Sequence, residues 1–389
     1  MRVVIIGGGA IGSAIAYFTL ADPQFRGSVQ VIERDPSYAR ASSALSASSI
    51  RQQFSSLINI QIGLFGIEFL RDVGRHLQID RAATPDIALR EQGYLFLASE
   101  AGAAQLRENH ALQVAQGAAI ELMSRDSLRG RFPWLEVGDL ALGAYGVRGE
   151  GWFDGYSLLQ AFRNKARALG AHYRQAEAVG LVMAGSKVKA VQLRDARDCE
   201  GDLFINAAGP WAAPVASWAQ IDLPVRARRR TVFVFDTPAT LPDCPLVIDP
   251  GGAYFRPEGR QFICGISPDA QDDPDEPPLE PEYCLFNERI WPALAARVAG
   301  FQALKQTRAW AGYYEMNLFD ANGLIGLHPA VENLIFANGF SGHGLQQSPA
   351  VGRGISELIV HGRFKTLDLS PLALDRVIRN QPLIERSIV

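Results

Sequence analysis

A glycine run near the start of the chain has the residue types and spacing to hold the phosphates of a dinucleotide. Residues 7–12 read Gly-Gly-Gly-Ala-Ile-Gly and lie between a β-branched apolar run, residues 3–6, and a helix-like segment, residues 13–20. In such a strand-turn-helix unit the first glycine makes the tight turn, the second admits a pyrophosphate at the helix N-terminus, and the third permits close helix packing. The predicted cofactor contacts are Gly7, Gly9, Ala10, Ile11 and Gly12.

An acidic residue follows at the position where a ribose would be recognised. Residues 29–32 form a second strand-like run that ends at Glu33, twenty-one residues after Gly12. A carboxylate at the end of this strand can accept hydrogen bonds from both ribose hydroxyls of an adenosine, and Arg34 is assigned to the same site. A glycine-rich turn without a nucleotide is the less favoured alternative. The motif by itself does not separate FAD from NAD.

Two later segments bring further backbone to the same ligand. Residues 202–211 form a short apolar strand that ends in small residues, which lets a loop lie against a dinucleotide. Residues 334–338 form another strand, followed by a Gly-Phe-Ser-Gly-His-Gly turn and a helix from about residue 347 to 360. Such a turn favours an anionic partner, here the flavin N1/C2 edge, which becomes negative on reduction. The predicted contacts are Ala207, Ala208, Gly209, Trp211, Gly339, Phe340, Ser341, Gly342, His343, Gly344, Leu345 and Gln346.

The composition excludes several classes of protein. The 389 residues, 48% hydrophobic and 20% charged, supply two or three domains and rule out a disordered or fibrous chain. A net charge of −3 argues against general nucleic-acid binding. Four cysteines without a Cys-x-x-Cys pair fit neither a disulfide framework nor a zinc site and indicate a reducing compartment. No apolar stretch of about 18 residues and no cleaved signal are found, so the expected location is the cytoplasm.

Seven motifs spread over the chain resemble one family. They are GGGAIG at 7–12, ERD at 33–35, ASSALSASSIRQQF at 41–54, DG at 154–155, INAAGPWA at 205–212, YFRPEG at 254–259 and GFSGHG at 339–344. Together they are similar to the D-amino-acid oxidase and sarcosine oxidase superfamily of FAD enzymes, over essentially the whole chain. Runs such as SIRQQFS and GFSGHGLQQSP look closest to one branch, the mitochondrial FAD-dependent oxidoreductase domain proteins implicated in complex I assembly and their bacterial relatives. Without a transit peptide, the chain looks like a bacterial member.

The resemblance implies an α/β fold of the glutathione-reductase and D-amino-acid-oxidase type. A discontiguous Rossmann-like FAD-binding domain is expected from residues 1–85, 146–218 and 320–389. A substrate domain with a large antiparallel or mixed β-sheet is expected from residues 86–145 and 219–319. Local patterns agree, because residues 228–235 and 253–265 read as strands and residues 283–299 read as a helix.

Two charged runs lie in the expected substrate domain. Residues 268–278 are acidic and rich in proline, which predicts a solvated surface connection. A calcium site is a distant second interpretation because the spacing fits no coordination loop. The one basic run, residues 226–230, predicts a solvated strand edge in preference to an anion-binding patch.

The resemblance also implies the cofactor, FAD, and how it is held. Sarcosine oxidases that bind FAD covalently use a cysteine whose matching position here is Gly312, so a noncovalent FAD is expected. The further cofactor contacts that the family implies are Ser42, Ser43, Ala44, Ser48, Ser49 and Val179.

Arginine and tyrosine positions that match the family are expected to hold the substrate. Arg51 matches the arginine that binds the substrate carboxylate, which suits a bidentate guanidinium, and a structural arginine bonding loop carbonyls is the alternative. The second carboxylate ligand of sarcosine oxidases is a lysine, replaced here by Gln346, which argues against a simple sarcosine-like substrate. Arg256, beside Tyr254 on an expected strand, could supply the missing charge. Tyr314 is expected to be pocket wall first and hydrogen-bond donor second.

Two further positions bear on proton and electron transfer. His343 could serve as a general base, but the same histidine belongs to the turn motif of the relatives, where its backbone serves the flavin, so a structural role is favoured. The lysine that sarcosine oxidases place over the flavin to activate oxygen matches Ile263. Because dioxygen then loses electrostatic help, a dehydrogenase is favoured over an oxidase.

Three functional hypotheses follow from the sequence. The first is an FAD-dependent oxidoreductase that oxidises an amine or amino acid, N-substituted, D-configured or opine-like, by hydride transfer to flavin N5, after which the imine hydrolyses. The second is a flavin-bearing assembly or interaction protein. The third is one subunit of a heteromeric amino-acid or opine dehydrogenase, with an electron-acceptor protein or partner subunit.

Overall fold

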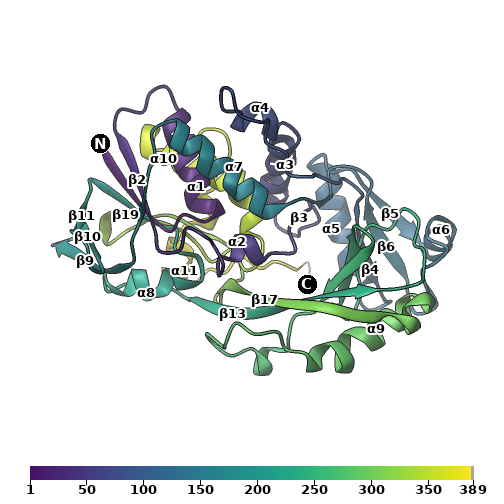
Figure 1. Ribbon diagram of the computed structural model, residues 1–389. Coiled ribbons are helices and arrows are strands. Elements are labelled where there is room, and N and C mark those ends of the chain that lie inside the picture. Colours follow the sequence, from purple (N-terminus) through teal and green to yellow (C-terminus); the bar gives the residue numbers. More distant parts are fainter. Residues whose placement is uncertain (387–389) are drawn as a thin grey trace.

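Two β-sheets and the helices around them organise the chain in the computed structural model, which describes residues 1–386 (Figure 1). Residues 387–389, at the end of the range predicted for the FAD-binding domain, lie outside the described residues. The first sheet has the strand order β18, β19, β12, β1, β2, β8. The strands span β1 Arg2–Ile6, β2 Ser28–Glu33, β8 His172–Gln175, β12 Leu203–Asn206, β18 Leu324–His328 and β19 Val331–Asn338.

Parallel pairing explains the composition of this sheet. Every neighbouring pair is parallel except β18 with β19. β1 lies between β2 and β12, and its residues 3–6 are buried. A central parallel strand covered on both faces requires an uninterrupted apolar run, which is what residues 3–6 supply.

The second sheet is larger and mixed. Its order is β17, β13, β16, β15, β14, β4, β6, β5, and only β4 with β14 is parallel. The strands span β4 Tyr94–Ala98, β5 Ile120–Ser124, β6 Leu142–Gly146, β13 Val225–Asp236, β14 Leu246–Ile248, β15 Tyr254–Glu258, β16 Gln261–Gly265 and β17 Lys305–Asn317. In Figure 1 the long strands β13 and β17 run along the lower side of the molecule beneath both parts. The two sheets confirm the predicted fold class, whereas the proposed domain boundaries stay a prediction.

Short strands and the helices complete the fold. β9 Ala178–Ala184, β10 Lys187–Leu193 and β11 Cys199–Glu200 form a three-stranded sheet, and β3 Ser49–Ile50 pairs with β7 Gly151–Trp152. The α-helices are α1 Ala10–Ala21, α2 Ser42–Leu45, α3 Leu57–Arg71, α4 Val73–Leu77, α5 Ala103–Ala115, α6 Arg125–Arg131, α7 Gly155–Ala168, α8 Ala212–Ser217, α9 Trp291–Arg297, α10 Gly344–His361 and α11 Asp375–Ile378.

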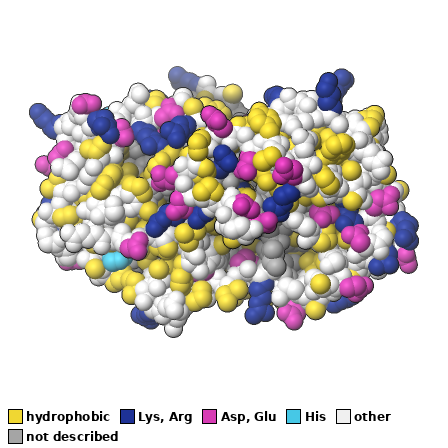
Figure 2. Space-filling view, turned by 90° about the horizontal axis from the view of Figure 1, so that it is seen from below, with side chains coloured by type: hydrophobic (Ala, Val, Ile, Leu, Met, Phe, Trp, Pro, Cys, Tyr) yellow, Lys and Arg dark blue, Asp and Glu magenta, His cyan; other side chains and the backbone are white. Residues whose placement is uncertain are grey.

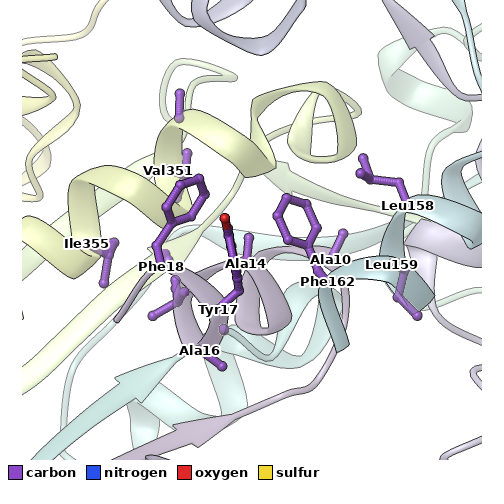
Figure 3. Close-up of a cluster of buried hydrophobic side chains, with 14 of the residues drawn as sticks. Ala10, Ala14, Ala16, Tyr17, Phe18, Leu158, Leu159, Phe162, Val351 and Ile355 are labelled. Carbon is purple, nitrogen blue, oxygen red and sulfur yellow. The ribbon is translucent and has the colours of Figure 1, made fainter. Parts of the chain in front are cut away.

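Helix α1, which carries the glycine run at its start, lies between α7 and α10 and packs against both (Figure 3). Tyr17 and Phe18 face Phe162 of α7, with 5.8 Å between the Tyr17 and Phe162 ring centroids. On the other side a Cβ at Gly352 of α10 would lie 2.7 Å from the Cβ of Ala14, so only glycine permits this approach. The packing fixes the start of α1 relative to α10, and both helix N-termini belong to the site described below.

Several predicted elements differ in their bounds. The helices expected at residues 13–20 and 347–360 begin three residues earlier, at Ala10 and Gly344. The helix expected over residues 283–299 is a π-helical turn, Phe286–Ile290, that continues into α9. The strand expected over residues 202–211 is β12 followed by a 3₁₀ turn, Gly209–Trp211. The apolar pattern predicts the interiors of these helices and turns, but their first residues include glycine and proline, which the pattern does not mark.

Salt bridges join the basic run to the acidic loop and to Glu282 just after it, which corrects the interpretation of the basic run. Arg228 pairs with Asp275 (2.9 Å), Arg229 with Glu282 (2.7 Å), and Arg230 with Asp273 (2.8 Å). The basic run is no solvated edge, because β13 lies between β17 and β16. The acidic loop is mostly exposed, as expected of a surface connection, and Asp273 and Asp275 attach it to β13. Figure 2 views the molecule from below, and acidic and basic side chains alternate over this face without a large area of one sign.

Three further features concern the cysteines, metal ligands and membrane-spanning helices. The four cysteines are free thiols, and only Cys284 is exposed. Within residues 1–386 no group of three or more His, Cys, Asp or Glu side chains could hold a metal ion. In the same part of the chain, none of the helices combines the length and apolar character needed to cross a membrane.

Candidate functional site

A cavity at the carboxyl end of β1 contains the glycine run, and we call it the glycine-loop cavity. Gly7 has a φ of +101°, and a Cβ there would overlap the carbonyl oxygen of Ala207, so the turn requires glycine. A Cβ at Gly12 would overlap the carbonyl oxygen of Gly7. Gly9 is the N-cap of α1 without a side-chain cap, and a Cβ there would meet only Ser43 Oγ at 3.5 Å. The N-terminus of α1 therefore borders open space at Gly9, with N–H groups of the kind that bind phosphate, although the N–H of Ala10 donates to Ser43 Oγ (3.1 Å).

Predicted and unpredicted residues line this cavity. They include Gly7, Gly9, Ala10, Ile11, Glu33, Arg34, Asp35, Tyr38, Arg40, Ser42, Ser43, Glu177, Ala178, Ala207, Ala208, Gly209, Trp211, Trp218 and Glu315.

The carboxylate of Glu33 is held in place at one end of the cavity. The backbone N–H of Gly8 donates to its Oε2 (2.8 Å) and that of Asp35 to its Oε1 (2.9 Å). Burial raises the pKa of Glu33 in spite of these two donors. Nearby, the guanidinium of Arg34 stacks on Trp211, 3.7 Å from the ring centroid. The result is a flat, polar end with a fixed acceptor, as an adenosine requires.

A second cavity lies against the face of the large sheet, and we call it the sheet-face cavity. It is lined by Ala10, Ile11, Ser42, Ser43, Leu45, Ser46, Ala47, Arg230, Val232, Tyr254, Gly312, Tyr313, Tyr314, Glu315, Gly342, Gly344 and Leu345. Ala10, Ile11, Ser42, Ser43 and Glu315 line both cavities, so the two join into one elongated trough. FAD, with an adenosine at one end and a flat ring at the other, fits a trough of this shape.

The sheet places the walls of the sheet-face cavity in register. Arg230 of β13 pairs with Gly312 of β17, and Arg228 pairs with Tyr314, so alternate residues of both strands share one face. The opposite face packs against α9 with buried phenylalanines such as Phe233 and Phe255. A Cβ at Gly312 would lie 3.0 Å from the Cβ of Leu45, so the position expected for a covalent cysteine is closely approached by α2.

Tyr254 and Tyr314 are two of the three phenols that line the sheet-face cavity, and the third, Tyr313, donates its hydroxyl to the carbonyl of Pro277. Burial raises the pKa of Tyr254 and of Tyr314 above its ordinary value, well above it for Tyr254, so both stay protonated at neutral pH. Their hydroxyls have no hydrogen-bond partner within residues 1–386. Each of these two phenols is therefore a wall with a donor available to a ligand.

Arg51, Gln346 and His343 form a cluster beside the turn at residues 339–344. The backbone N–H of Arg51 donates to Gln346 Oε1 (2.9 Å), and its guanidinium donates to the carbonyl of Gln53 and to His343 Nε2 (3.0 Å). The ring of Phe54 lies 4.1 Å from the Arg51 guanidinium carbon. Arg51 is only 3% exposed and has no ion-pair partner in the described chain. It does not line either cavity.

The contact with Arg51 fixes the protonation state of His343. Arginine has no acceptor, so Nε2 of His343 accepts and the ring is neutral. Burial, helped by the positive charge of Arg51, lowers the pKa of His343 to about 3. A histidine whose free lone pair is already bonded to a guanidinium is a poor proton acceptor.

Glu150, which no sequence motif marks, supports the cluster of Arg51, Gln346 and His343. Its carboxylate accepts from the backbone N–H of Gln52 (2.6 Å) and of Gln53 (3.1 Å) and from Gln53 Nε2 (2.7 Å). Burial raises its pKa to about 7, while Gln53, Gln52 and the charge of Arg51 act in the opposite direction. Glu150 thus holds residues 52 and 53, which follow Arg51. No local pattern marks a lone glutamate between two glycines as a support of this kind.

Arg256 lies away from the sheet-face cavity, in a third cavity that also contains Ala44, Ser48 and Ile263. Its guanidinium donates to the carbonyl of Ala47 (2.7 Å) and pairs with Glu258. In the sheet Arg256 is directly opposite Ile263. The structure therefore does not bring Arg256 together with Tyr314 and Arg51, because β15 carries Tyr254 and Arg256 two residues apart toward different cavities.

Four other predicted residues, Val179, Ser49, Phe340 and Ser341, line none of the three cavities. Val179 is 39% exposed, and the residue of β9 that lines the glycine-loop cavity is its neighbour Ala178. The hydroxyl of Ser49 shares a hydrogen bond with that of Tyr94 (3.3 Å). Phe340 is buried in the core around α1, and Ser341 Oγ accepts from the backbone N–H of Asn317 (3.0 Å). These last two residues attach the glycine-rich turn to β17.

A trough that joins a Rossmann-type glycine loop to the face of a large mixed sheet defines a flavoprotein of the oxidoreductase class. The family described as FAD dependent oxidoreductase (DAO) matches residues 2–358, so the chain belongs to this family, and its cofactor is FAD. The resemblance of the motifs to that superfamily is thus confirmed.

Individual relatives agree with the family. The "FAD-dependent oxidoreductase domain-containing protein 1" of Xenopus laevis is 44% identical over 421 aligned residues, which cover 100% of this chain and 84% of the relative. Among solved structures, L-proline dehydrogenase from P. horikoshii has a TM-score of 0.86 at 24% identity, with 98% of each chain covered. Glycine oxidase from Geobacillus kaustophilus has a TM-score of 0.81 at 21% identity, with 96% of this chain and 98% of that chain covered.

Proposed function

We propose that the chain oxidises an amine or amino acid that carries a carboxylate. FAD, when bound, accepts a hydride at its N5. The substrate loses that hydride from the carbon next to nitrogen and a proton from nitrogen, and water then converts the imine to a carbonyl compound and a free amine. Relatives named as a proline dehydrogenase and a glycine oxidase support an amino acid as the substrate class.

The observation that carries the proposal is that the buried guanidinium of Arg51 forms no ion pair within residues 1–386, since the nearby carboxylate of Glu150 accepts from residues 52 and 53 instead. A buried guanidinium without a carboxylate partner is costly unless an anion arrives with the ligand. Arg230, the guanidinium that lines the sheet-face cavity, already binds Asp273 through both terminal nitrogens (2.8 and 2.9 Å). A substrate carboxylate at Arg230 would have to displace Asp273, whereas one at Arg51 would supply a missing partner. Arg51 is therefore the proposed carboxylate ligand, and a substrate bound there has to reach beyond the sheet-face cavity, which Arg51 does not line.

Neighbouring residues orient the same substrate. Gln346 positions Arg51 through its backbone N–H, and Tyr254 and Tyr314 are walls with free hydroxyl donors. His343 holds the guanidinium and does not take the proton of the amine, which must bind in its neutral form. Glu150 fixes the strand end that carries Arg51.

The electron acceptor is proposed to be something other than dioxygen. Ile263 contributes no charge, and the charge of Arg256 opposite it is paired with Glu258. Without an unpaired cation at this point, a developing superoxide gains little stabilisation. An electron-acceptor protein or a partner subunit fits this arrangement, and a cytoplasmic location stays a prediction.

The test is an anaerobic titration of the holoprotein followed by its visible spectrum. D-amino acids, N-methyl amino acids and opines are added in turn, each beside the matching amine without a carboxylate. Bleaching by one carboxylate-bearing class, with slow recovery in air and fast recovery with an artificial acceptor, is expected. A bound flavin that no candidate bleaches would overturn the proposal and favour an assembly protein or a subunit that works only with its partner.

A further inference from the structure

Glu315 is a buried carboxylate at the junction of the two cavities. It lies in β17 directly after Tyr314, is 9% exposed, and lines both the glycine-loop cavity and the sheet-face cavity. An FAD that extends from Glu33 to the sheet face has to pass this point with the linker between its adenosine and its ring. No sequence motif marks Glu315, because an acid in a strand of a mixed sheet has no pattern of its own.

The contacts of Glu315 leave part of its carboxyl group available. The backbone N–H of Gly339 donates to its Oε2 (3.0 Å), and the backbone N–H of Ser341 donates to its main-chain carbonyl (3.1 Å). A Cβ at Gly344 would lie 3.2 Å from its Oε1, so the glycine-rich turn is closely packed around the group. Within the described chain no lysine, arginine or histidine forms an ion pair with Glu315.

A carboxylate with one donor and no cation is unfavourable in a buried place. Burial accordingly raises the pKa of Glu315 to about 8, against the opposing effect of the Gly339 N–H. The two phosphate charges of a bound FAD would disfavour the ionised form further. A protonated carboxyl, in contrast, has an O–H donor and keeps an acceptor for Gly339.

We propose that Glu315 binds FAD as a neutral carboxylic acid, accepting the N–H of Gly339 with one oxygen and donating its proton to an oxygen of the cofactor's linker with the other. Glu315 is then a cofactor-positioning residue. It attaches the centre of FAD to the turn at residues 339–344 and to β17 at once. The inference does not depend on which substrate the protein oxidises.

A pH dependence of cofactor affinity follows from this role. Loss of the proton removes the donor and sets a carboxylate beside the phosphates, so the Kd for FAD rises by up to tenfold per pH unit above the pKa of the apoprotein. Other charged groups facing the trough are Glu33, Asp35, Arg34, Arg40, Glu177 and Arg230. Tyr254 and Tyr314 stay protonated in the interval from pH 7 to 9 because burial raises their pKa values.

The experiment measures FAD binding to apoprotein by quenching of cofactor fluorescence between pH 6 and 9, without substrate. For the wild type the Kd is expected to rise about tenfold from pH 7 to 9. Glu315→Gln keeps a donor and an acceptor at every pH, so its Kd at pH 7 should lie within about threefold of the wild type and change little with pH. Glu315→Ala should bind FAD about tenfold more weakly at pH 7. Glu121→Gln, an exposed position of β5, is the matched control.

Two results would overturn the inference. One is a Glu315→Gln variant that keeps the wild-type rise of Kd with pH. The other is a folded Glu315→Gln variant that binds FAD as weakly at pH 7 as Glu315→Ala, because a neutral amide should satisfy the role. If Glu315→Ala does not fold, the pH profile of Glu315→Gln decides alone.

Discussion

The two ends of the trough are built in different ways. At the glycine-loop end, backbone positions of one short segment form the site, and Gly7 and Gly12 are required by contacts within that segment and with Ala207. At the sheet-face end, side chains from three strands meet, and Arg230, Tyr254 and Tyr314 come from residues far apart in sequence. A site made of backbone tolerates no added atom, whereas a site made of side chains can change its ligand by single substitutions.

Removing a required glycine should have the largest effect. In Gly12→Ala the new Cβ overlaps the carbonyl of Gly7, so we expect a loss of about 3 kcal/mol in the free energy of unfolding. Gly9→Ala is the matched control, because its Cβ enters open space. The apo form of Gly9→Ala should be within about 0.5 kcal/mol of the wild type in chemical denaturation, yet bind FAD more than tenfold more weakly. An apo Gly9→Ala that unfolds as readily as Gly12→Ala would show that this space belongs to the fold and not to the cofactor.

At the other end, Arg51→Ala should change ligand preference without changing the cofactor. Loss of a buried guanidinium that binds a carboxylate should destabilise the transition state of flavin reduction by about 3 kcal/mol. The second-order rate constant for flavin reduction by the substrate should then fall roughly a hundredfold. For amines without a carboxylate this rate constant should fall much less, and the FAD content of the protein should stay the same. Arg51→Lys should recover part of the loss. Equal losses for both kinds of substrate would instead favour a structural arginine.

Glu33→Ala tests the polar end of the glycine-loop cavity. Without the ribose acceptor, FAD should bind about tenfold more weakly, corresponding to about 1.4 kcal/mol, as measured by cofactor fluorescence. The affinity of Glu33→Gln for FAD should lie between those of the wild type and Glu33→Ala, because its amide oxygen still accepts one hydrogen bond. An unchanged affinity in Glu33→Ala would exclude the contact with the ribose.

The smallest effect is expected where the acidic loop meets β13. Arg230 and Asp273 have side chains only 11% and 13% exposed, so Asp273→Asn should lower the free energy of unfolding by about 1 kcal/mol. Asp275 is 50% exposed, and Asp275→Asn should stay within about 0.5 kcal/mol. Thermal melts at low and high salt would check both. Equal effects would mean that burial does not distinguish the two pairs.

The same contrast explains what the sequence could predict. The glycine run and Glu33 follow local patterns, since strand, turn and helix are adjacent in the chain, and the fold class followed from the resemblance of seven motifs to a known family. The pairing of residues 226–230 with the acidic loop was not foreseen, because it depends on where β13 lies in the sheet. Glu150 and Glu315 were missed because their burial is decided by distant segments. Arg256 was expected beside the substrate, but the register of β15 places it in another cavity.

The order of the first sheet has a consequence for how the protein is made. β1 leaves the ribosome well before β19 and the turn at residues 339–344, which complete the trough, because more than 300 residues lie between them. At about 5–20 residues per second, the glycine loop waits roughly 20 to 70 s for this partner. The complete trough therefore exists only after residues 339–344 have been made, and FAD bound there contacts segments that leave the ribosome at very different times.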